Sequence, residues 1–218
     1  MWPNPGNPKR LLMQALIIAN GDLPDMKRMT SILRRCDVIV CADGGANAAR
    51  KRGITPDVIL GDLDSISSST KKFFQNVPLL HIDDQYSTDL EKAISYCVKR
   101  KYKSISIVGM TGSRIDHTTA SLGCFKKFRG QIELQMYDRE GEIVLLEKKT
   151  SLVTRKGEKI SLIPLERCTG VTTKNLFYSL KNETLELGVR EGISNIATAR
   201  RVTVSYKAGI LLLYRFYE

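Results

Sequence analysis

Two aspartates separated by one leucine, Asp62 and Asp64, follow a short apolar segment that ends at Gly61. If the chain stays extended beyond Gly61, both carboxylates point to the same face. Two carboxylates about 4 Å apart repel each other by roughly 4 kcal/mol at an effective dielectric constant of 20, so the pair needs a cation, a shared proton or water. Mg²⁺ beside a phosphate substrate is the commonest setting for such ligands. The alternative is a solvated turn in which Asp64 and Ser65 begin a helix.

The elements that must position these aspartates alternate between strand and helix. Apolar runs with β-branched residues predict buried strands, and capped amphipathic segments between them predict helices. Strands that are apolar throughout and separated by helices favour a parallel sheet covered on both faces. We expect strands at 11–19, 37–42, 57–61, 78–82 and 104–108, and helices at 26–35, 46–52 and 88–100, with two more that end near 74 and 128.

From residue 131 onward the sequence changes to short alternating segments between turn residues, a pattern typical of an antiparallel sandwich or barrel. We therefore predict an α/β protein with an N-terminal Rossmann-like parallel-sheet domain over residues 1–138, in which residues 1–10 form a loose tail. A smaller all-β sandwich domain is expected over residues 139–218. Its expected strands, including the one just before the boundary, are 132–137, 142–147, 159–164, 170–173, 184–187, 201–206 and 210–217.

Acidic residues follow the carboxyl ends of several predicted strands, which is where ligands bind in an open α/β sheet. Asp43 follows the second strand, Asp62 and Asp64 follow the third, Asp89 opens the next helix and Asp116 lies at the start of the last one. Each acid alone could shape a turn or complement a helix dipole. Together, in a chain of net charge +11, they indicate a common site.

Glycine-containing turns lie at the same predicted edge of the sheet. Gly44 and Gly45 come between the second strand and its helix, and Gly109 and Gly112 come between the fifth strand and its helix. Free N–H groups at such helix starts bind phosphate, and Arg114 would add a permanently charged contact. The turns match neither a Walker loop nor the dinucleotide fingerprint. Either one taken alone is best explained as an ordinary tight strand–helix turn.

Composition narrows the classes of partner. The net charge of +11 favours anionic ligands, but the basic runs are not interleaved with aromatic residues as in a single-strand binding surface. We therefore expect no nucleic-acid partner, and a basic nucleic-acid-binding module remains the non-enzymatic alternative. The five scattered cysteines predict neither a disulfide framework nor a zinc site. Without an apolar span or a signal peptide, the chain is expected to be cytoplasmic, with no membrane partner.

Taken in order, the motifs resemble those of the thiamine pyrophosphokinase family. They cover residues 43–47, 61–65, 84–89 and 109–117, and a further match at 192–195 extends the resemblance over nearly the whole chain. The resemblance implies an α/β catalytic domain followed by a β-sandwich that binds thiamine. It implies Mg²⁺-dependent transfer of the terminal diphosphate of ATP to the primary hydroxyl of thiamine, with release of AMP. It also implies a homodimer with its sites at the subunit interface.

The resemblance also implies roles for individual residues. The metal ligands would be Asp62, Asp64 and Asp89, with Asp43 near the metal, and the catalytic set would add Arg114 and Asp116 to the first three. The ATP contacts would be Asp43, Gly44, Gly45, Asn47, Gly109, Thr111, Gly112, Ser113 and Arg114. The thiamine contacts would be Gln85, Ser194 and Asn195. A general base is not clearly required, and Asp89 or Asp116 is the candidate if there is one.

One position departs from the family pattern. Family members often carry a tryptophan in the last strand that packs on thiamine, but this strand contains Tyr214, and the sole tryptophan is Trp2 in the predicted tail. An aliphatic contact or Tyr214 would have to replace the stacking. A diphosphokinase that acts on another heteroaromatic alcohol is therefore the alternative enzymatic interpretation.

Overall fold

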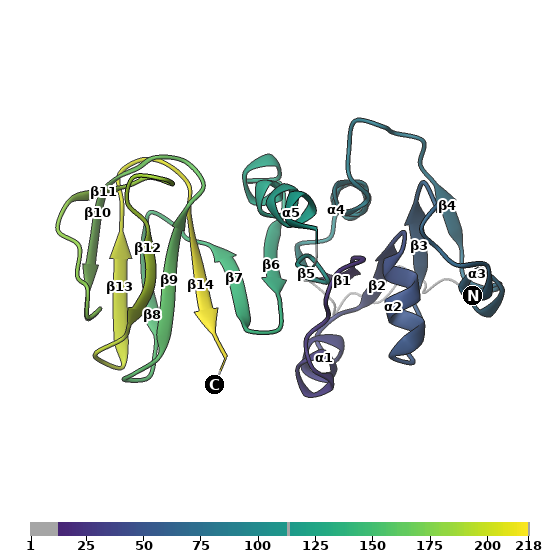
Figure 1. Cartoon of the computed structure of the whole chain (residues 1–218), viewed down its shortest axis with the longest axis horizontal. Helices are drawn as coiled ribbons and strands as arrows, with labels where there is room; N and C mark the ends of the chain where they lie inside the picture. Colours follow the sequence, from purple (N-terminus) through teal and green to yellow (C-terminus); the bar gives the residue numbers. More distant parts are fainter. Residues whose placement is uncertain (1–12, 113, 218) are drawn as a thin grey trace.

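The computed structural model describes residues 13–112 and 114–217. The predicted tail over residues 1–10, including Trp2, and the predicted ATP contact Ser113 lie outside the described residues. The helices gather over one end of the molecule, and the other end is built from strands (Figure 1). One long sheet connects the two ends.

Six strands form the parallel part of that sheet, in the order β6-β5-β1-β2-β3-β4. Each of the central strands is apolar on both sides because helices cover both faces; in β1, Ala15 and Ile17 face one core while Leu16 and Ile18 face the other. The strands are β1 (Gln14–Ile18), β2 (Val38–Ala42), β3 (Val58–Gly61), β4 (Leu79–His81), β5 (Ser104–Val108) and β6 (Glu133–Tyr137).

Five helices cover this part of the sheet. Residues of α4 and α5 pack into the first core and residues of α1 and α2 into the second, so the helices divide between the two faces. Thr88 and Glu91 form the predicted capping box at the start of α4, and Glu91 also pairs with Lys127 of α5 at 3.0 Å. The helices are α1 (Met26–Leu33), α2 (Gly45–Lys51), α3 (Ser68–Phe73), α4 (Asp89–Lys99) and α5 (Ile115–Lys127).

The same sheet continues with four antiparallel strands in the order β6-β7-β14-β9-β12, which brings it to ten strands. A second sheet of order β11-β10-β13-β8 packs against it, and both sheets contribute to one apolar core that includes Leu162, Leu213, Val171 and Val204. The added strands are β7 (Gly141–Leu145), β8 (Lys149–Val153), β9 (Lys159–Pro164), β10 (Cys168–Lys174), β11 (Glu183–Leu185), β12 (Gly192–Ile196), β13 (Arg201–Ser205) and β14 (Leu211–Phe216).

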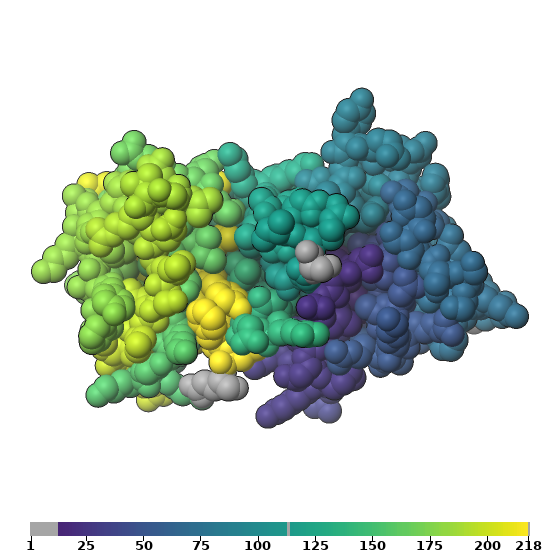
Figure 2. Space-filling model, in the orientation of Figure 1, coloured from purple at the N-terminus to yellow at the C-terminus, as the bar shows by residue number. Residues whose placement is uncertain are grey.

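The predicted domain boundary does not coincide with a break in the sheet. β6 pairs with β7 across it, with Gln135 opposite Val144, so the parallel and antiparallel parts share one hydrogen-bonded sheet. In the space-filling view, β14, in yellow, lies between the green strands of the β-rich end and the teal segment (Figure 2). The chain is thus a mixed α/β protein built on one large sheet.

Two features of the β-rich half differ from the sequence prediction. β6 was grouped with the antiparallel strands because its residues alternate, but it pairs in parallel with β5. β8 and β12 were not predicted as strands. In β12 the register shifts between Gly192 and Asn195, and Ser194 has a φ of 55°, so the segment has the sequence of a turn although it pairs with β9.

Two further expectations concern the environment of the protein. Within residues 13–112 and 114–217, no helix is both long and apolar enough to cross a membrane. All five cysteines lie in the described part of the chain and all are free thiols.

Candidate active site

A cavity of about 370 Å³ opens at the carboxyl ends of the parallel strands, as expected for an open α/β sheet. The loops that follow β1, β2, β3 and β5 contribute to its wall. Among the residues predicted for the site, those that line it are Asp43, Asp62, Gln85, Asp89, Gly109, Thr111, Gly112 and Arg114.

Three of the predicted metal ligands lie together. One carboxylate oxygen from each of Asp43, Asp62 and Asp64 lies within 4.8 Å of the others. The predicted reason for the convergence of Asp62 and Asp64 was wrong, because the backbone does not stay extended. Leu63 has a left-handed φ of 64°, and the Asp64 N–H points back to Asp62 Oδ1 at 3.4 Å. A turn, rather than strand alternation, brings the two carboxylates together.

Asp43 is the most deeply buried of these acids, with 3 % of its surface exposed. Its Oδ2 accepts a hydrogen bond from the Ser65 N–H at 3.2 Å, whereas its Oδ1 is buried without a partner among the described residues. Burial raises the pKa of the Asp43 carboxyl above its usual value, and repulsion from Asp89 and Asp62 acts in the same direction. A buried carboxylate oxygen is costly without a compensating partner, and a cation would supply one.

Gly61 makes room for this cluster at the end of β3. Its φ is 141°, and a Cβ at this position would lie 2.8 Å from Asp89 Oδ1 and 2.9 Å from Asp43 Cβ. Any larger residue would push apart two of the acids while straining the backbone. The glycine before Asp62 therefore allows Asp43 and Asp89 to approach each other.

Lys92 was not predicted from the sequence as a residue of the site. It lies on α4, its side chain is 3 % exposed, and its Nζ lies 3.0 Å from Asp89 Oδ1 and 3.9 Å from Asp62 Oδ2. This buried cation offsets part of the negative charge of the cluster and holds Asp89 in place. The available signal was its i, i+3 spacing from Asp89 on a helix whose first turn was already predicted to enter the site.

The acid cluster fits Mg²⁺. Its donors are carboxylate oxygens, which suit a hard cation, and neither a thiolate nor an imidazole belongs to the group of three. The unpartnered Asp43 oxygen and the space kept by Gly61 are the features that a bound cation would use.

The predicted glycine loop after β5 packs against the loop after β1. The N–H of Gly21 donates to the Gly109 carbonyl at 2.8 Å, and the N–H of Asp22 donates to the Thr111 carbonyl at 2.6 Å. A Cβ at Gly21 would lie 2.1 Å from the Thr111 carbonyl oxygen, so only glycine allows this contact. Gly109 has a φ of 73°. Gly21 thus shapes the glycine loop after β5, and it was not among the residues predicted for the site.

Gly44, Gly45 and Asn47 are not among the lining residues of the cavity. A Cβ at Gly45 would lie 2.0 Å from the Ile18 carbonyl oxygen, so this glycine lets α2 pack closely on β1. The amide of Asn47 donates to the Ser65 carbonyl at 2.8 Å and accepts from the Ser67 N–H at 3.1 Å. These contacts support the loop that carries Asp64, and an ATP contact by these three residues stays a prediction.

Arg114 and Asp116 form an exposed ion pair at the start of α5. The Arg114 Nε donates to Asp116 Oδ1 at 2.9 Å, and its Nη2 contacts Oδ2. Arg114 lines the cavity but Asp116 does not. Hydrogen bonds from Arg114 hold the pKa of the Asp116 carboxyl well below its usual value. His117 also lines the cavity and was given no role from the sequence.

The loop that carries Gln85 is ordered by Asp84. The Ser87 hydroxyl donates to Asp84 Oδ2 at 2.5 Å, and the Tyr86 N–H donates to Oδ1 at 2.9 Å, as in an Asx turn. The hydrogen bond from Ser87 lowers the pKa of Asp84. Gln85 itself donates to Asp83 Oδ1 at 3.3 Å. The loop thus presents Gln85 at the edge of the acid cavity.

The structure does not bring Ser194 and Asn195 to this cavity. They lie in β12, at one edge of the ten-stranded sheet, whereas β3 is eight strand-to-strand steps away near the other edge. At about 4.8 Å per step, this is a separation of roughly 38 Å along the sheet. Figure 1 shows β12 and β3 at opposite ends of the molecule. The predicted thiamine contacts of one chain therefore lie at two separate places.

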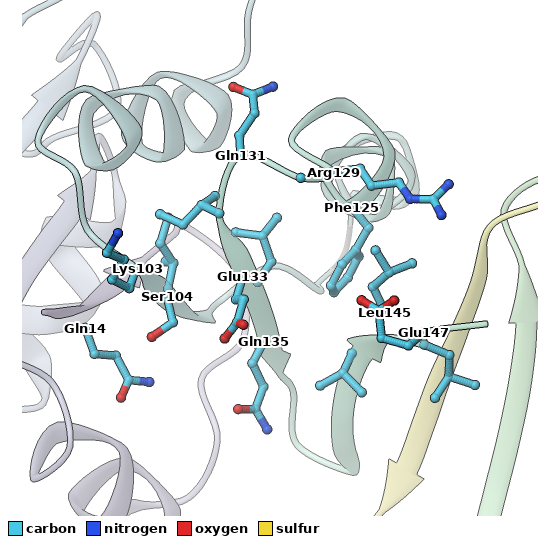
Figure 3. Close-up of a pocket in the computed structure, with 16 residues that line it drawn as sticks. Gln14, Lys103, Ser104, Phe125, Arg129, Gln131, Glu133, Gln135, Leu145 and Glu147 are labelled. Atoms are coloured by element: carbon cyan, nitrogen blue, oxygen red, sulfur yellow. The ribbon is translucent and has the colours of Figure 1, made fainter. Parts of the chain in front are cut away.

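A larger hollow of about 740 Å³ lies at the opposite end of the parallel strands. Figure 3 shows Glu133 and Gln135 of β6 in its middle, with Gln14 and Lys103 on one side and Glu147 on the other. None of the described residues predicted for the site lines this hollow. Ligands of open α/β sheets bind at the carboxyl ends, so the smaller, acidic cavity is the candidate active site.

Two family models match consecutive parts of the chain. The model described as "Thiamin pyrophosphokinase, catalytic domain" matches residues 29–136, and the model described as "Thiamin pyrophosphokinase, vitamin B1 binding domain" matches residues 143–211. The chain belongs to the thiamine pyrophosphokinase family. The first match contains every predicted metal ligand, and the second contains Ser194 and Asn195.

Curated relatives and a solved structure agree with this family. Thiamine pyrophosphokinase 1 of Arabidopsis thaliana is 29% identical over 90% of this chain and 84% of its own length. Thiamine pyrophosphokinase of Bacillus subtilis is 27% identical over 91% of this chain and 96% of its own. The crystal structure of thiamine pyrophosphokinase from Bacillus subtilis has the same fold, with a TM-score of 0.82, 24% identity, and 94% and 99% of the two chains covered.

Proposed function

We propose that this chain transfers the terminal diphosphate of ATP to the hydroxyl of thiamine and releases thiamine diphosphate and AMP. The single observation that carries this proposal is the acid cluster of Asp43, Asp62 and Asp64 at the strand ends of a chain that belongs to the thiamine pyrophosphokinase family. In this reaction the thiamine hydroxyl oxygen attacks the β-phosphorus, and the bond from that phosphorus to the bridging oxygen of AMP breaks. The hydroxyl proton is lost in the same process.

Asp43, Asp62, Asp64 and Asp89 would hold Mg²⁺. When bound, the ion neutralises the phosphates and stabilises charge that develops in the transition state. The chain itself keeps the carboxylates close together: Gly61 provides the space, the Ser65 N–H orients Asp43, and Lys92 offsets the charge of Asp89. Without these supports, the repulsion between these four neighbouring acids would be less well compensated.

Arg114 and the loop from Gly109 to Gly112 would bind the phosphates of ATP. Arg114 is exposed and lines the cavity, so its guanidinium is able to make bidentate contact with an anion. Its present partner, Asp116, competes for the same guanidinium groups. Binding of ATP would therefore replace a contact within the chain by one to phosphate.

Of the two candidate general bases, Asp89 lines the cavity and Asp116 does not. Arg114 contacts both oxygens of Asp116 and lowers its pKa, which makes Asp116 a weak proton acceptor. Asp89 lines the cavity beside Lys92, where its carboxylate is held at 3.0 Å from Nζ. A proton released from the thiamine hydroxyl would pass to Asp89 or to solvent.

We also propose that the active form is a homodimer with its sites between subunits. Gln85 lies at the acid cavity, whereas Ser194 and Asn195 lie roughly 38 Å away along the sheet of the same chain. A second copy would bring its β12 to the first copy's acid cavity. This arrangement assigns catalysis to residues 1–138, as an α/β Rossmann-like domain, and thiamine binding to residues 139–218, as a β-sandwich domain, and the two family matches support the division.

A reducing cytoplasm is the proposed location. Five free thiols, four of them buried, persist most readily where disulfides do not form. Burial raises the pKa of the Cys36 thiol, the less buried one, to about 11, which keeps it protonated and weakly reactive near neutral pH.

The test is an assay of the purified chain with ATP, Mg²⁺ and thiamine, in which AMP and thiamine diphosphate are separated and quantified. We expect equal amounts of the two products and no product after chelation of the metal. Absence of both products from a folded, Mg²⁺-supplied protein would refute the proposal. Neither the other heteroaromatic acceptors nor the nucleic-acid-binding alternative is favoured by the family matches.

A further inference from the structure

Two adjacent aromatic residues, Phe177 and Tyr178, stand exposed in the connection between β10 and β11. Phe177 is 65% exposed and Tyr178 is 63% exposed. Their rings pack edge to face, with centroids 4.9 Å apart. This connection runs beside β12, since the Phe177 N–H donates to the Ile196 carbonyl at 2.9 Å. An exposed aromatic pair next to an edge strand is a surface that can bind a flat ligand.

Asn195 fixes the backbone of this pair. Its Oδ1 accepts from the Tyr178 N–H at 3.0 Å, and its Nδ2 donates to the Tyr178 carbonyl at 2.8 Å. Asn195 is only 4% exposed. Both polar atoms of its side chain therefore form hydrogen bonds within the chain. The effect of Asn195 on the surface is to fix the position of Tyr178.

No other aromatic residue in the segment matched to the vitamin B1 binding domain is available to a ligand. Residues 143–211 all lie in the described part of the chain, and their aromatic residues are Phe177, Tyr178 and Tyr206. Tyr206 is buried, and its hydroxyl donates to the Leu146 carbonyl at 2.6 Å. Tyr214, the replacement considered from the sequence, lies outside this match, packs on Phe216 and donates its hydroxyl to Asp138.

We propose that Phe177 and Tyr178 form the aromatic wall on which thiamine packs, and that Asn195 is the positioning residue for Tyr178. This inference rests on the proposed function. Thiamine carries a cationic thiazolium ring and a flat aminopyrimidine ring, and both are attracted by the face of an aromatic side chain. The pair supplies the aromatic surface that the missing tryptophan would have supplied.

The experiment compares Phe177→Ala and Tyr178→Ala with the matched control Phe73→Ala in the full chain. Phe73 is also exposed and also T-shaped on its neighbour, Phe74, but it lies on α3. Steady-state assays give kcat and the KM values for thiamine and ATP. We expect each of the first two variants to raise the thiamine KM about tenfold or more, with the KM for ATP and kcat within about twofold of wild type. Tyr178→Phe should behave as wild type, because it keeps the ring.

The role of Asn195 is tested by a double-mutant cycle. Asn195→Ala should raise the thiamine KM, and Asn195→Ala with Tyr178→Ala should be no worse than Tyr178→Ala alone, because without the Tyr178 ring Asn195 has no ring to position. Additive effects would show that Asn195 acts independently of Tyr178 and would overturn its positioning role.

Calorimetric titration of thiamine into the wild-type chain separates this inference from the proposed function, because binding needs no turnover. Weaker binding by Phe177→Ala and Tyr178→Ala supports the aromatic wall even if the assay yields no product. Unchanged affinity, or no binding to wild type, would overturn it. Sedimentation velocity shows whether the two variants still form the dimer. If they lose the dimer but keep their affinity for thiamine, the pair belongs to an interface between copies, and the aromatic-wall proposal is also overturned.

Discussion

The acid cavity and the edge of the sheet at β12 are built in different ways. In the cavity, contacts within the chain position the acids: the Ser65 N–H orients Asp43, the buried Lys92 pairs with Asp89, and Gly61 leaves room for both. At the β12 edge, Phe177 and Tyr178 stand exposed on a backbone held by one asparagine.

This difference matches the two kinds of recognition that we propose for these regions. Carboxylates that share a cation must be fixed before the ligand arrives, because their mutual repulsion otherwise drives them apart. An aromatic surface carries no net charge and tolerates exposure to solvent. It can therefore stay exposed until a ligand or a second subunit binds. Variants in the cavity should therefore change kcat, and variants at the β12 edge should change the thiamine KM.

The largest effect is expected from Asp62→Asn and Asp64→Asn. Each removes one charged ligand from the cluster and should lower kcat by about a hundredfold or more, with the circular dichroism spectrum unchanged. Glu133→Gln is the matched control, because it removes an acid from the larger hollow at the other end of the sheet. Near-normal turnover in either aspartate variant would take that residue out of the metal site.

The next largest effect concerns the pair of Asp89 and Lys92. Asp89→Asn leaves the buried Lys92 ammonium with only Asp62, at 3.9 Å, and should cost about 2–4 kcal/mol of stability. Lys92→Met should cost less, because the Asp89 carboxylate that remains is partly exposed to water. Urea denaturation measures both. The reverse order of the two losses would contradict a buried cation held by the acids.

A smaller effect is expected from Gly61→Ala. The new Cβ would meet Asp89 and Asp43 and strain a backbone with a φ of 141°, at a cost of about 2–3 kcal/mol. Gly53→Ala is the control, because Gly53 also has a positive φ but a Cβ there meets nothing within 4 Å. Thermal melting should show a loss of about 1 kcal/mol for the control, and only Gly61→Ala should also lower kcat.

The smallest effect is expected from Ser87→Ala, in the loop that carries Gln85. Loss of the Ser87 hydrogen bond should raise the pKa of Asp84 toward its usual value. Because a lowered folded-state pKa contributes stability above the unfolded-state pKa and loses it in acid, the variant should be less stable than wild type at neutral pH and equally stable at low pH. A carboxylate NMR titration and urea denaturation at both pH values test this. A pKa of Asp84 that does not move would show that Ser87 does not hold the loop.

Much of the fold could be predicted, because its elements carry local signals. The apolar runs of β1, β2 and β5 and the capping box at Thr88 can each be recognised from residues that are close together in the sequence. β12 could not be predicted, because its pairing with β9 tolerates a left-handed Ser194 that sequence patterns assign to a turn. The continuity of the sheet from β6 to β7 also depends on contacts that no local pattern contains.

The candidate site was predictable to the extent that its residues follow strand ends. Asp43, Asp62 and Asp89 lie together at the carboxyl ends of the parallel strands, as predicted. Lys92 escaped notice because a lysine on a helix is usually solvated, and its burial becomes visible only when α4 is packed on the sheet. Phe177 and Tyr178 escaped notice because their neighbour Asn195 is distant in sequence, and the hydrogen bonds that join them are tertiary contacts.

β14 has a consequence for synthesis of the protein. It pairs with β7 on one side and β9 on the other, and it comes later in the chain than both. During translation, the inner edges of β7 and β9 therefore stay unpaired until residues 211–216 have left the ribosome. Unpaired strand edges are sites of misassembly for nascent chains. Slow translation or early interruption just before this strand would therefore leave two exposed edges in the middle of what becomes one sheet.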